Sequence, residues 1–342
     1  MLQRLGDWSD VCALGLPCQK GQARKLIKNV GIDIGSTTVK VVVMEGDRVL
    51  YRVYQRHLSQ VRQATLRALE GAKQFLDGPF QVAISGSAGL GLAEDAGVDF
   101  VQEVFATYKT VMEYEPDTDA VIELGGEDAK IIFLSGGLEE RMNGSCAGGT
   151  GAFIDQMATL LNVTPEQLDQ LSLHHERIYP IASRCGVFAK TAIQPLLNQE
   201  DVAASIFQAV VDQTVTGLSQ GRKIEGKVLF LGGPLFFFKG LQQRFEQTLR
   251  LAPGKAVFPE WAQYSVALGA AIYTRGLQTT YTYEQFTEQL KNICSRCLQI
   301  RRSTTNLYSA TAAPMFRGRT SQDIAEMPTL ASTAAPPPPS WC

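Results

Sequence analysis

Short alternating runs of apolar and polar residues near the start of the chain predict β-strands. Residues 30–34 form an apolar strand, a polar turn follows at 35–38, and a second strand is expected at 39–44. A Gly-Asp turn then leads into a third strand at 48–54. From residue 59 to 76 the apolar positions change to helical spacing. The pattern therefore predicts a three-stranded antiparallel unit followed by a helix.

The same order of elements recurs from residue 119. Strands are expected at 120–124, 129–134 and 138–142, with a glycine-containing turn at 125–128 between the first two. Each unit has an acidic residue and glycines around its first turn. This weak internal duplication predicts that the fold is built from two related halves.

The rest of the chain is predicted to be mostly helical, with two further strands and two irregular ends. Helices are expected at 150–161, 165–171, 187–197, 201–217, 241–249 and 265–273, and strands at 80–85 and 227–231. The ends differ in composition from this middle part. Residues 1–28 form a basic arm. The character of the chain changes beyond residue 280, and residues 303–342 are rich in Ser, Thr, Ala and Pro, which predicts disorder.

Composition excludes several classes of protein. The 342 residues are 45% hydrophobic, which is enough to build a large core, and the net charge of −2 provides no basic surface for nucleic acid. Every apolar run is too short or too interrupted to cross a membrane, and the first twenty residues lack the features of a signal peptide. We therefore expect a cytoplasmic protein that binds neither nucleic acid nor membrane.

The first turn carries the residue types that bind Mg²⁺ and phosphate. Asp33 ends a buried strand, where a carboxylate can hold Mg²⁺ through water. The residues after it combine a close backbone approach, hydroxyl groups and a positive charge, which together suit an anion. The predicted phosphate-binding residues of this turn are Gly35, Ser36, Thr37, Thr38 and Lys40.

The second turn repeats this chemistry, and a third motif completes a nucleotide site. Glu123 takes the position of the acid, and Gly125 and Gly126 form the turn. A single polar hairpin is common, but two of them facing each other would hold a nucleoside triphosphate from both sides. Gly232 and Gly233 end the strand at 227–231 before a helix, which offers a flat backbone surface for adenosine. The three motifs in this order predict an ATP site.

Two of the seven cysteines precede predicted helices. Cys146 lies before the helix at 150 and Cys185 before the helix at 187, and helix N-termini favour thiolates and anionic clusters. A cubane iron–sulfur cluster usually needs four thiolates. A two-fold dimer with two cysteines from each chain would supply them.

Other candidate ligands are weaker. Cys294 and Cys297 form a CxxC pair that offers a competing set within one chain, although chance spacing in the tail is the favoured explanation. The three histidines, His57, His174 and His175, are expected on the surface or in loops and not as ligands.

Two long motifs carry a family resemblance. These are the stretches NGSCAGGTG at 143–151 and ASRCGVFA at 182–189. With the three nucleotide motifs, residues 30–275 resemble the ATP-dependent activators of 2-hydroxyacyl-CoA dehydratases and the ATPase subunits of benzoyl-CoA reductase, the BadF/BadG/BcrA/BcrD type. The likeness is greatest to the activator domain that begins longer multidomain members. It implies an α/β fold of the actin, heat-shock-chaperone and sugar-kinase kind, ribonuclease H-like and duplicated, with two subdomains around an ATP cleft.

The resemblance also gives expected domain boundaries. These are a basic arm at 1–28, a first subdomain with both phosphate hairpins at 29–145, a second, helix-rich subdomain with the cysteines and the adenosine motif at 146–278, and a divergent, disordered tail at 279–342.

The function implied by the resemblance is ATP-driven electron transfer. One [4Fe-4S] cluster, held by Cys146 and Cys185, would be shared across a homodimer. Asp33 and Glu123 would place Mg²⁺ and the attacking water. A ferredoxin- or flavodoxin-type donor would reduce the cluster, and one low-potential electron would pass to a dehydratase-type partner.

Two departures from the family pattern keep alternatives open. Ala192 stands where the relatives usually carry an acid, and Glu123 where the wider superfamily often has Asp. One alternative is a small-molecule kinase or ATP sensor of the same fold without a cluster. The other is a truncated, non-catalytic remnant.

Overall fold

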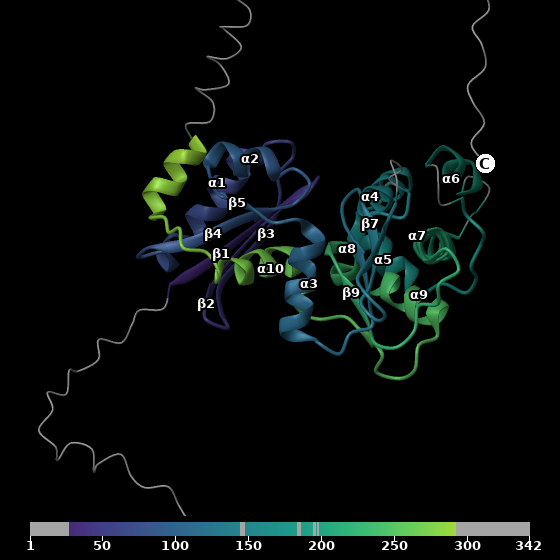
Figure 1. Cartoon of the computed structure of the whole chain (residues 1–342). Coiled ribbons are helices and arrows are strands. Elements are labelled where there is room, and N and C mark those ends of the chain that lie inside the picture. The colour runs from purple at the N-terminus through teal and green to yellow at the C-terminus, as the bar shows by residue number, and fades with distance from the viewer. Residues whose placement is uncertain (1–26, 144–147, 183–185, 194–195, 197, 292–342) are drawn as a thin grey trace, which may run out of the picture. The chain divides into compact units, whose positions relative to one another are not determined.

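The structure, a computed structural model, describes residues 27–143, 148–182, 186–193, 196 and 198–291. The chain divides into two units, Met1–Ile293 and Cys294–Cys342, and every described residue belongs to the first. Two five-stranded sheets with helices around them form the described part (Figure 1).

The first sheet has the strand order β3-β2-β1-β4-β5. Its strands are β1 (Lys28–Ile34), β2 (Thr38–Glu45), β3 (Arg48–Arg56), β4 (Phe80–Ser85) and β5 (Asp99–Phe100). One face packs on α1 (Val61–Ala72) and α2 (Leu90–Ala96), and α10 (Ser265–Thr274) covers the other. Because both faces are covered, β2 reads as a nearly continuous apolar run.

The second sheet has the strand order β10-β9-β6-β7-β8. Its strands are β6 (Ala120–Leu124), β7 (Ala129–Phe133), β8 (Glu139–Met142), β9 (Val228–Leu231) and β10 (Ala256–Val257). One face packs on the helices of the second half, which are α4 (Gly151–Leu160), α5 (Pro165–Ser172), α6 (Gly186–Ile193), α7 (Gln199–Ser219) and α9 (Lys239–Leu249). The other face packs on α3 (Glu103–Tyr114).

The two sheets share one topology, which confirms the predicted duplication. In each, three antiparallel strands that follow one another in sequence are extended by two parallel strands beside the first of them. Asp33 pairs in register with Lys40 on β2, and Glu123 pairs with Lys130 on β7. The two acid-bearing hairpins are therefore equivalent parts of the two halves.

The strand pairing differs from the predicted division at residue 145. The sequence assigned both phosphate hairpins to a first subdomain at 29–145, but β6, β7 and β8 belong to the second sheet with β9 and β10. The reason is the parallel pairing of β6 with β9, which joins segments more than 100 residues apart in the sequence. Each half therefore has its own phosphate hairpin.

Helices α3 and α10 pack against each other between the sheets (Figure 1). The Thr110 hydroxyl on α3 donates a hydrogen bond to the Ser265 carbonyl oxygen at 2.6 Å. A Cβ at Gly269 would lie 1.8 Å from the Ala106 carbonyl oxygen, so only glycine permits this close approach. This helix pair is the main link between the two halves.

The segment just beyond residue 279 is ordered, so the predicted start of the disordered tail was wrong. Tyr281 exchanges two backbone hydrogen bonds with Phe80 of β4, at 2.8 and 2.9 Å. Residues 283–291 are helical, and Phe286 and Leu290 are fully buried in the core of the first half. Their i, i+4 spacing places them on one helix face.

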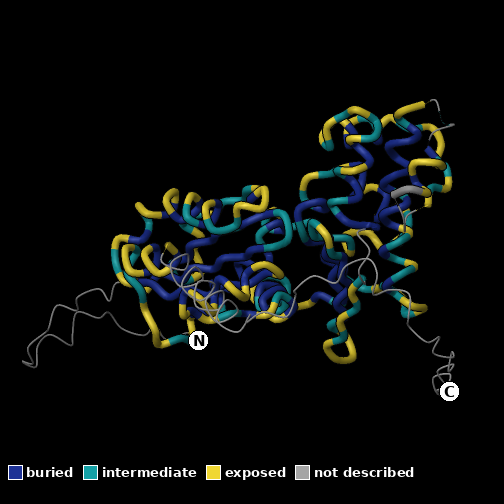
Figure 2. Tube along the Cα trace, turned by 90° about the horizontal axis from the view of Figure 1, so that it is seen from above, coloured by how far each residue is buried: buried dark blue, intermediate teal, exposed yellow. Residues whose placement is uncertain are grey.

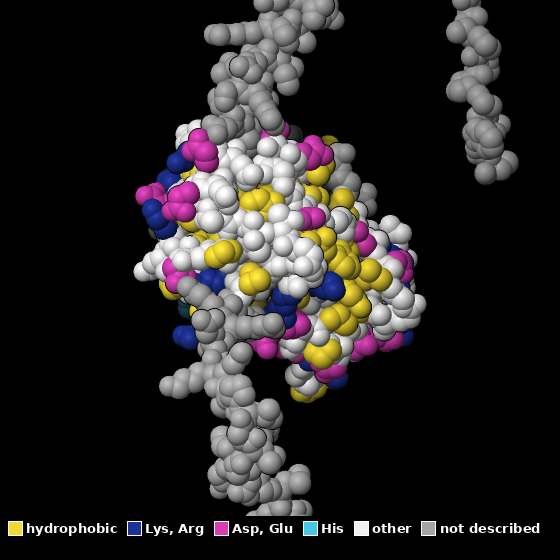
Figure 3. All heavy atoms as spheres, turned by 60° about the vertical axis from the view of Figure 1, so that its left-hand side comes forward, with side chains coloured by type: hydrophobic (Ala, Val, Ile, Leu, Met, Phe, Trp, Pro, Cys, Tyr) yellow, Lys and Arg dark blue, Asp and Glu magenta, His cyan; other side chains and the backbone are white. Residues whose placement is uncertain are grey.

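Burial follows the two sheets and the faces of the helices that cover them (Figure 2). On the face in Figure 3, acidic and basic side chains are interspersed and apolar side chains gather in a band. No described helix is long and apolar enough to span a membrane.

Candidate functional site

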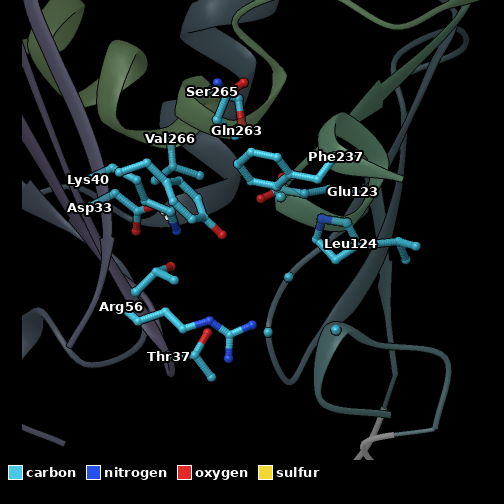
Figure 4. A pocket seen from close by; sticks show the side chains of 18 of the residues that line it. Asp33, Thr37, Lys40, Arg56, Glu123, Leu124, Phe237, Gln263, Ser265 and Val266 are labelled. Atoms are coloured by element: carbon cyan, nitrogen blue, oxygen red, sulfur yellow. Dashed lines mark ion pairs between the residues drawn. The ribbon is translucent and has the colours of Figure 1, made fainter. Parts of the chain in front are cut away.

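A cavity of about 100 Å³ lies where the two hairpins meet the β9–α8 connection (Figure 4). Helix α8 is Gly233–Phe237. The cavity is lined by most of the residues predicted from the nucleotide motifs, namely Asp33, Thr37, Thr38, Lys40, Glu123, Gly125, Gly126, Gly232 and Gly233. Gly35 and Ser36 belong to the first turn but do not line the cavity. The structure therefore brings all three motifs to one place.

The first hairpin presents a buried ion pair. The Lys40 ammonium lies 2.9 Å from an Asp33 carboxylate oxygen, and the two side chains are only 14% and 7% exposed. Burial alone would lower the pKa of Lys40, but Asp33, with help from Tyr54 and Glu123, raises it above the usual value. Lys40 is therefore a stable positive charge beside the cavity.

The second hairpin presents a carboxylate that does not make the matching ion pair. The Thr107 hydroxyl of α3 donates to Glu123 Oε2 at 3.1 Å. Burial raises the pKa of Glu123 to about 7, against the opposing effect of Lys130 and with further contributions from nearby acids. Without a bound cation, Glu123 is thus poised between its neutral and ionised forms.

Lys130 is held by other acids. Its ammonium lies 2.6 Å from Asp128 and also contacts Glu103 at the start of α3. The two hairpins therefore differ in their ion pairs. Lys40 neutralises Asp33, whereas Lys130 pairs with Asp128 and Glu103 and leaves Glu123 available to a cation. Carboxylate oxygens are ligands that Mg²⁺ prefers, so this donor fits such an ion.

Two glycines are fixed by close contacts at the cavity. A Cβ at Gly126 would lie 2.4 Å from Thr37 Oγ1, so the tips of the two hairpins touch. Gly232 has φ of 92°, and a Cβ there would lie 2.0 Å from the Leu124 carbonyl oxygen. The predicted glycines at 126 and 232 are therefore required by geometry as well as by motif.

Helix α4 is tied to the cavity at two points. The amides of Gly151 and Ala152 donate to the carbonyls of Gly125 and Gly126, at 3.0 and 2.7 Å. One turn further along α4, Asp155 accepts two hydrogen bonds from Arg56 at the end of β3, at 2.8 and 3.1 Å. Helix α4 is therefore in direct contact with both the second turn and β3.

Several lining residues were not anticipated from the sequence, among them Tyr54, Phe237 and Gln263. Tyr54 on β3 packs edge-on against Phe237 at 5.4 Å between ring centroids, and its hydroxyl lies against Gly233. Gln263 is 7% exposed, and its buried carbonyl oxygen has no hydrogen-bond partner among the described residues. A buried acceptor without a donor is costly, so a bound ligand with an N–H or O–H group fits this position. No sequence motif marked it, because a lone Gln before a helix is unremarkable in pattern.

The predicted cluster ligands lie outside the described residues. Cys146 and Cys185 fall in the gaps at 144–147 and 183–185, and the competing pair Cys294 and Cys297 lies beyond residue 291. Among the residues that the structure describes, no group of three or more His, Cys, Asp and Glu side chains is arranged to hold a metal ion.

Comparison with known proteins agrees with the geometry. The model of the BadF/BadG/BcrA/BcrD ATPase family matches residues 30–274. The chain belongs to this family. The predicted recognition is therefore confirmed, and so is the duplicated fold with an ATPase cleft, which two solved activator structures share.

Several relatives within this family are informative. An uncharacterized protein of Methanocaldococcus jannaschii is 31% identical over 265 residues, which cover 72% of this chain and 62% of that protein's length. The (R)-2-hydroxyglutaryl-CoA dehydratase activating ATPase of Acidaminococcus fermentans is 27% identical over 72% of this chain and 96% of its own. The structure of the 2-hydroxyisocaproyl-CoA dehydratase activator of Clostridium difficile with bound ADPNP has a TM-score of 0.65 and 25% identity, covering 78% of this chain and 98% of the activator.

Proposed function

We propose that this chain is an ATP-hydrolysing activator that passes one electron at low potential to a 2-hydroxyacyl-CoA dehydratase or a related acyl-CoA reductase. The observation that carries the proposal is the single cavity on which both acid-bearing hairpins and the Gly232-Gly233 turn converge. Relatives named as dehydratase activators and as a benzoyl-CoA reductase subunit support the choice of partner.

Nucleotide binding would use the whole cavity. The triphosphate would lie between the two turns, with Lys40 supplying positive charge on one side and Gly125 and Gly126 lining the other. The adenosine would lie against Gly232 and Gly233. The described cavity, at about 100 Å³, is smaller than the several hundred Å³ of typical ligand pockets, so the halves must part to admit ATP.

Hydrolysis would depend on the two buried acids. Asp33 and Glu123 would position Mg²⁺ and the attacking water, since phosphoryl transfer needs mainly positioning and charge stabilisation. Glu123 suits this task because a divalent cation would favour its ionised form, whose pKa burial has raised to about 7. Thr107 would keep its carboxylate in place.

The cluster would be held by Cys146 and Cys185 of each subunit in a homodimer. Helix α6 begins at Gly186, directly after Cys185, and contacts α4, which begins five residues after Cys146. The contact between the two helices supports the pairing of the two cysteines. When bound, a [4Fe-4S] cluster accepts and donates one electron, and a ferredoxin- or flavodoxin-type protein would be the donor.

The link from nucleotide to cluster would be α4. Its first amides bind the second phosphate turn and Asp155 binds Arg56 on the first half. A change in the separation of the turns would therefore shift α4 relative to α6. Ala192 lies on α6, the helix that follows Cys185, and departs from the family's usual acid there.

The test is anaerobic purification of the full chain with iron, sulfide and ATPase activity measured together. A bridged dimer predicts about two irons per chain, lost in either Cys146→Ala or Cys185→Ala, with Cys294→Ala as matched control. Colourless protein that still binds ATP would favour the kinase or sensor alternative. About four irons per chain that are lost on changing Cys294 would contradict the shared cluster.

A further inference from the structure

The sequence suggested a surface or loop position for His57. The residue lies in the loop directly after β3, next to the first phosphate turn, and is buried there. Its side chain is 5% exposed. The Ser59 amide donates to Nδ1 at 3.1 Å, so Nδ1 carries no proton. Nε2 therefore carries it and donates to the Gly35 carbonyl oxygen at 3.0 Å. Backbone groups on both sides hold the imidazole in one tautomer and one orientation.

The backbone of His57 holds the same turn at a second point. Its amide donates to the Thr37 carbonyl oxygen at 3.1 Å. In a trans peptide the C=O and the following N–H point in opposite directions. Fixing the carbonyls of Gly35 and Thr37 toward His57 therefore turns the amides of Ser36 and Thr38 away from it. His57 thus sets the orientation of two peptide planes in the turn that would cradle phosphate.

The backbone after His57 is strained in a way that serves this contact. Leu58 and Ser59 have φ of 47° and 63°, the left-handed region that non-glycine residues rarely adopt. Leu58 is 78% exposed, so packing of its side chain does not explain the conformation. The bonds from Ser59 to the ring and from Gln60 to the His57 carbonyl oxygen, at 2.7 Å, hold this segment. Strain of this kind is retained where the surrounding structure fixes it, commonly at functional sites.

We infer that His57 is a positioning residue for phosphate binding: through its Nε2–H it holds the Gly35–Thr38 turn in the conformation that receives the nucleotide's phosphates. The inference rests on the proposed nucleotide site. His57 itself does not line the cavity, and it acts only through the turn. If His57 were only a structural cap between β3 and α1, its substitution would lower stability. It would then affect the binding of ligands with and without phosphates equally.

The experiment compares three substitutions in the full chain. Gln places an amide N–H near the position of Nε2, Asn is one bond shorter, and Phe fills the volume without a donor. His174→Gln is the matched control, because His174 is an exposed histidine elsewhere in the chain. Calorimetry measures the binding of ADPNP and of adenosine, which lacks phosphates, and thermal melting measures stability.

A positioning role predicts that His57→Asn and His57→Phe weaken ADPNP binding by about tenfold, the effect of one lost hydrogen bond, while adenosine binding is unchanged. His57→Gln and His174→Gln should bind both ligands like the wild type. Equal loss of both ligands, or unchanged ADPNP binding in folded His57→Asn protein, overturns the inference but leaves the proposed function standing. Failure of the wild-type chain to bind ADPNP overturns both.

Discussion

The two equivalent acids of the site, Asp33 and Glu123, have different charge environments, and the chemistry of the site depends on this difference. Asp33 and Glu123 occupy matching positions in the two halves, yet Asp33 is paired with Lys40, while Glu123 accepts only the Thr107 hydroxyl among the interactions described above. Lys130 is shared with Asp128 and Glu103. An ion pair in one half and a destabilised carboxylate in the other give the cavity one fixed charge and one that responds to its ligand.

The variant Glu123→Gln tests whether burial destabilises the ionised form of Glu123. An acid whose pKa is raised binds protons more tightly in the folded state. Burial of Glu123 therefore lowers the free energy of unfolding as the pH rises from 4.5, the pKa of the unfolded state, to about 7, the pKa of the folded state. The neutral amide removes that cost. The free energy of unfolding of the variant relative to wild type should therefore increase by about 3 kcal/mol between pH 4.5 and pH 8, measured by urea titration without Mg²⁺. Parallel pH curves for the two proteins would contradict it.

The sequence predicts the site residues that belong to a repeated motif, but not those whose roles depend on the fold. Asp33, Lys40 and Glu123 were found because the hairpin occurs twice. Gln263 and His57 were missed because their roles arise from contacts across the fold: the Gln263 carbonyl is isolated only by its surroundings, and His57 acquires its tautomer from Ser59 and Gly35. Neither condition can be read from residue types or spacing.

At the scale of elements, α10 determines how closely the halves approach. A Cβ at Gly31 on β1 would lie 1.9 Å from the Ala267 carbonyl oxygen of α10, and Gly269 on α10 meets Ala106 of α3. The helix is thus in backbone contact on two sides. The sequence anticipated this helix from its small residues, whereas α3 was not predicted, because part of its buried face consists of Thr107 and Thr110 and lacks the usual apolar stripe.

Gly269→Ala should therefore destabilise the protein strongly. The added methyl would lie within 2 Å of backbone atoms that cannot move without separating α3 from α10. We expect a loss of about 3 kcal/mol or more in unfolding free energy, since overpacking a tight contact commonly costs 1–3 kcal/mol. Gly91→Ala on α2 is the control, because nothing lies within 4 Å of a Cβ there. Equal thermal midpoints for the two variants would refute the expectation.

The Arg56–Asp155 pair links β3 to α4 across the cavity. Because the two side chains are 57% and 35% exposed, its effect on global stability should be small, about 0.2–1 kcal/mol. The effect of the pair on the opening of the cavity between the two halves should be larger than its effect on stability. In stopped-flow release of a fluorescent ATP analogue, Arg56→Ala and Asp155→Ala should each speed release, and the double variant should be no faster than the faster single variant. Arg275→Ala, which removes exposed pairs to Asp47 and Glu113, is the control; additive effects at 56 and 155 would rule out the link.

Most strands and long helices were predicted to within a few residues, because the strands are compact apolar runs and their hairpins have clear turns. Apart from α3 and the helical segment at 283–291, the elements that were missed are short. Strands β5 and β10 are two residues each, α8 has five residues, and α2 has seven. The two strands form because β5 pairs with β4 and β10 pairs with β9, and no local periodicity marks them. The placement of β6 in the second sheet likewise required the pairing with β9.

For the molecule as a whole, the segment at 281–291 extends the first half of the fold beyond α10. Phe286 is fully buried and packs edge-on against Phe80 at 6.0 Å, Leu290 is also fully buried, and Tyr281 adds a bridge to β4 and a hydrogen bond to the Gly97 carbonyl oxygen at 2.9 Å. A composition-based boundary at 279 cuts through this core. The match to the family model ends at residue 274, so this segment lies just outside that match.

A truncation series tests whether this segment completes the first half. A chain that ends after residue 293 keeps the whole unit Met1–Ile293 and should melt like the full chain. A chain that ends after residue 279 leaves Phe80 without its partner, and Phe286→Ala in the full chain should cost about 3–5 kcal/mol, the usual loss for a buried Phe. Because β4 pairs directly with β1, which carries Asp33, weaker packing here should also weaken nucleotide binding. If the shorter chain melts at the same temperature as the longer one and binds ADPNP equally well, the segment is an appendage and the folded unit ends with α10.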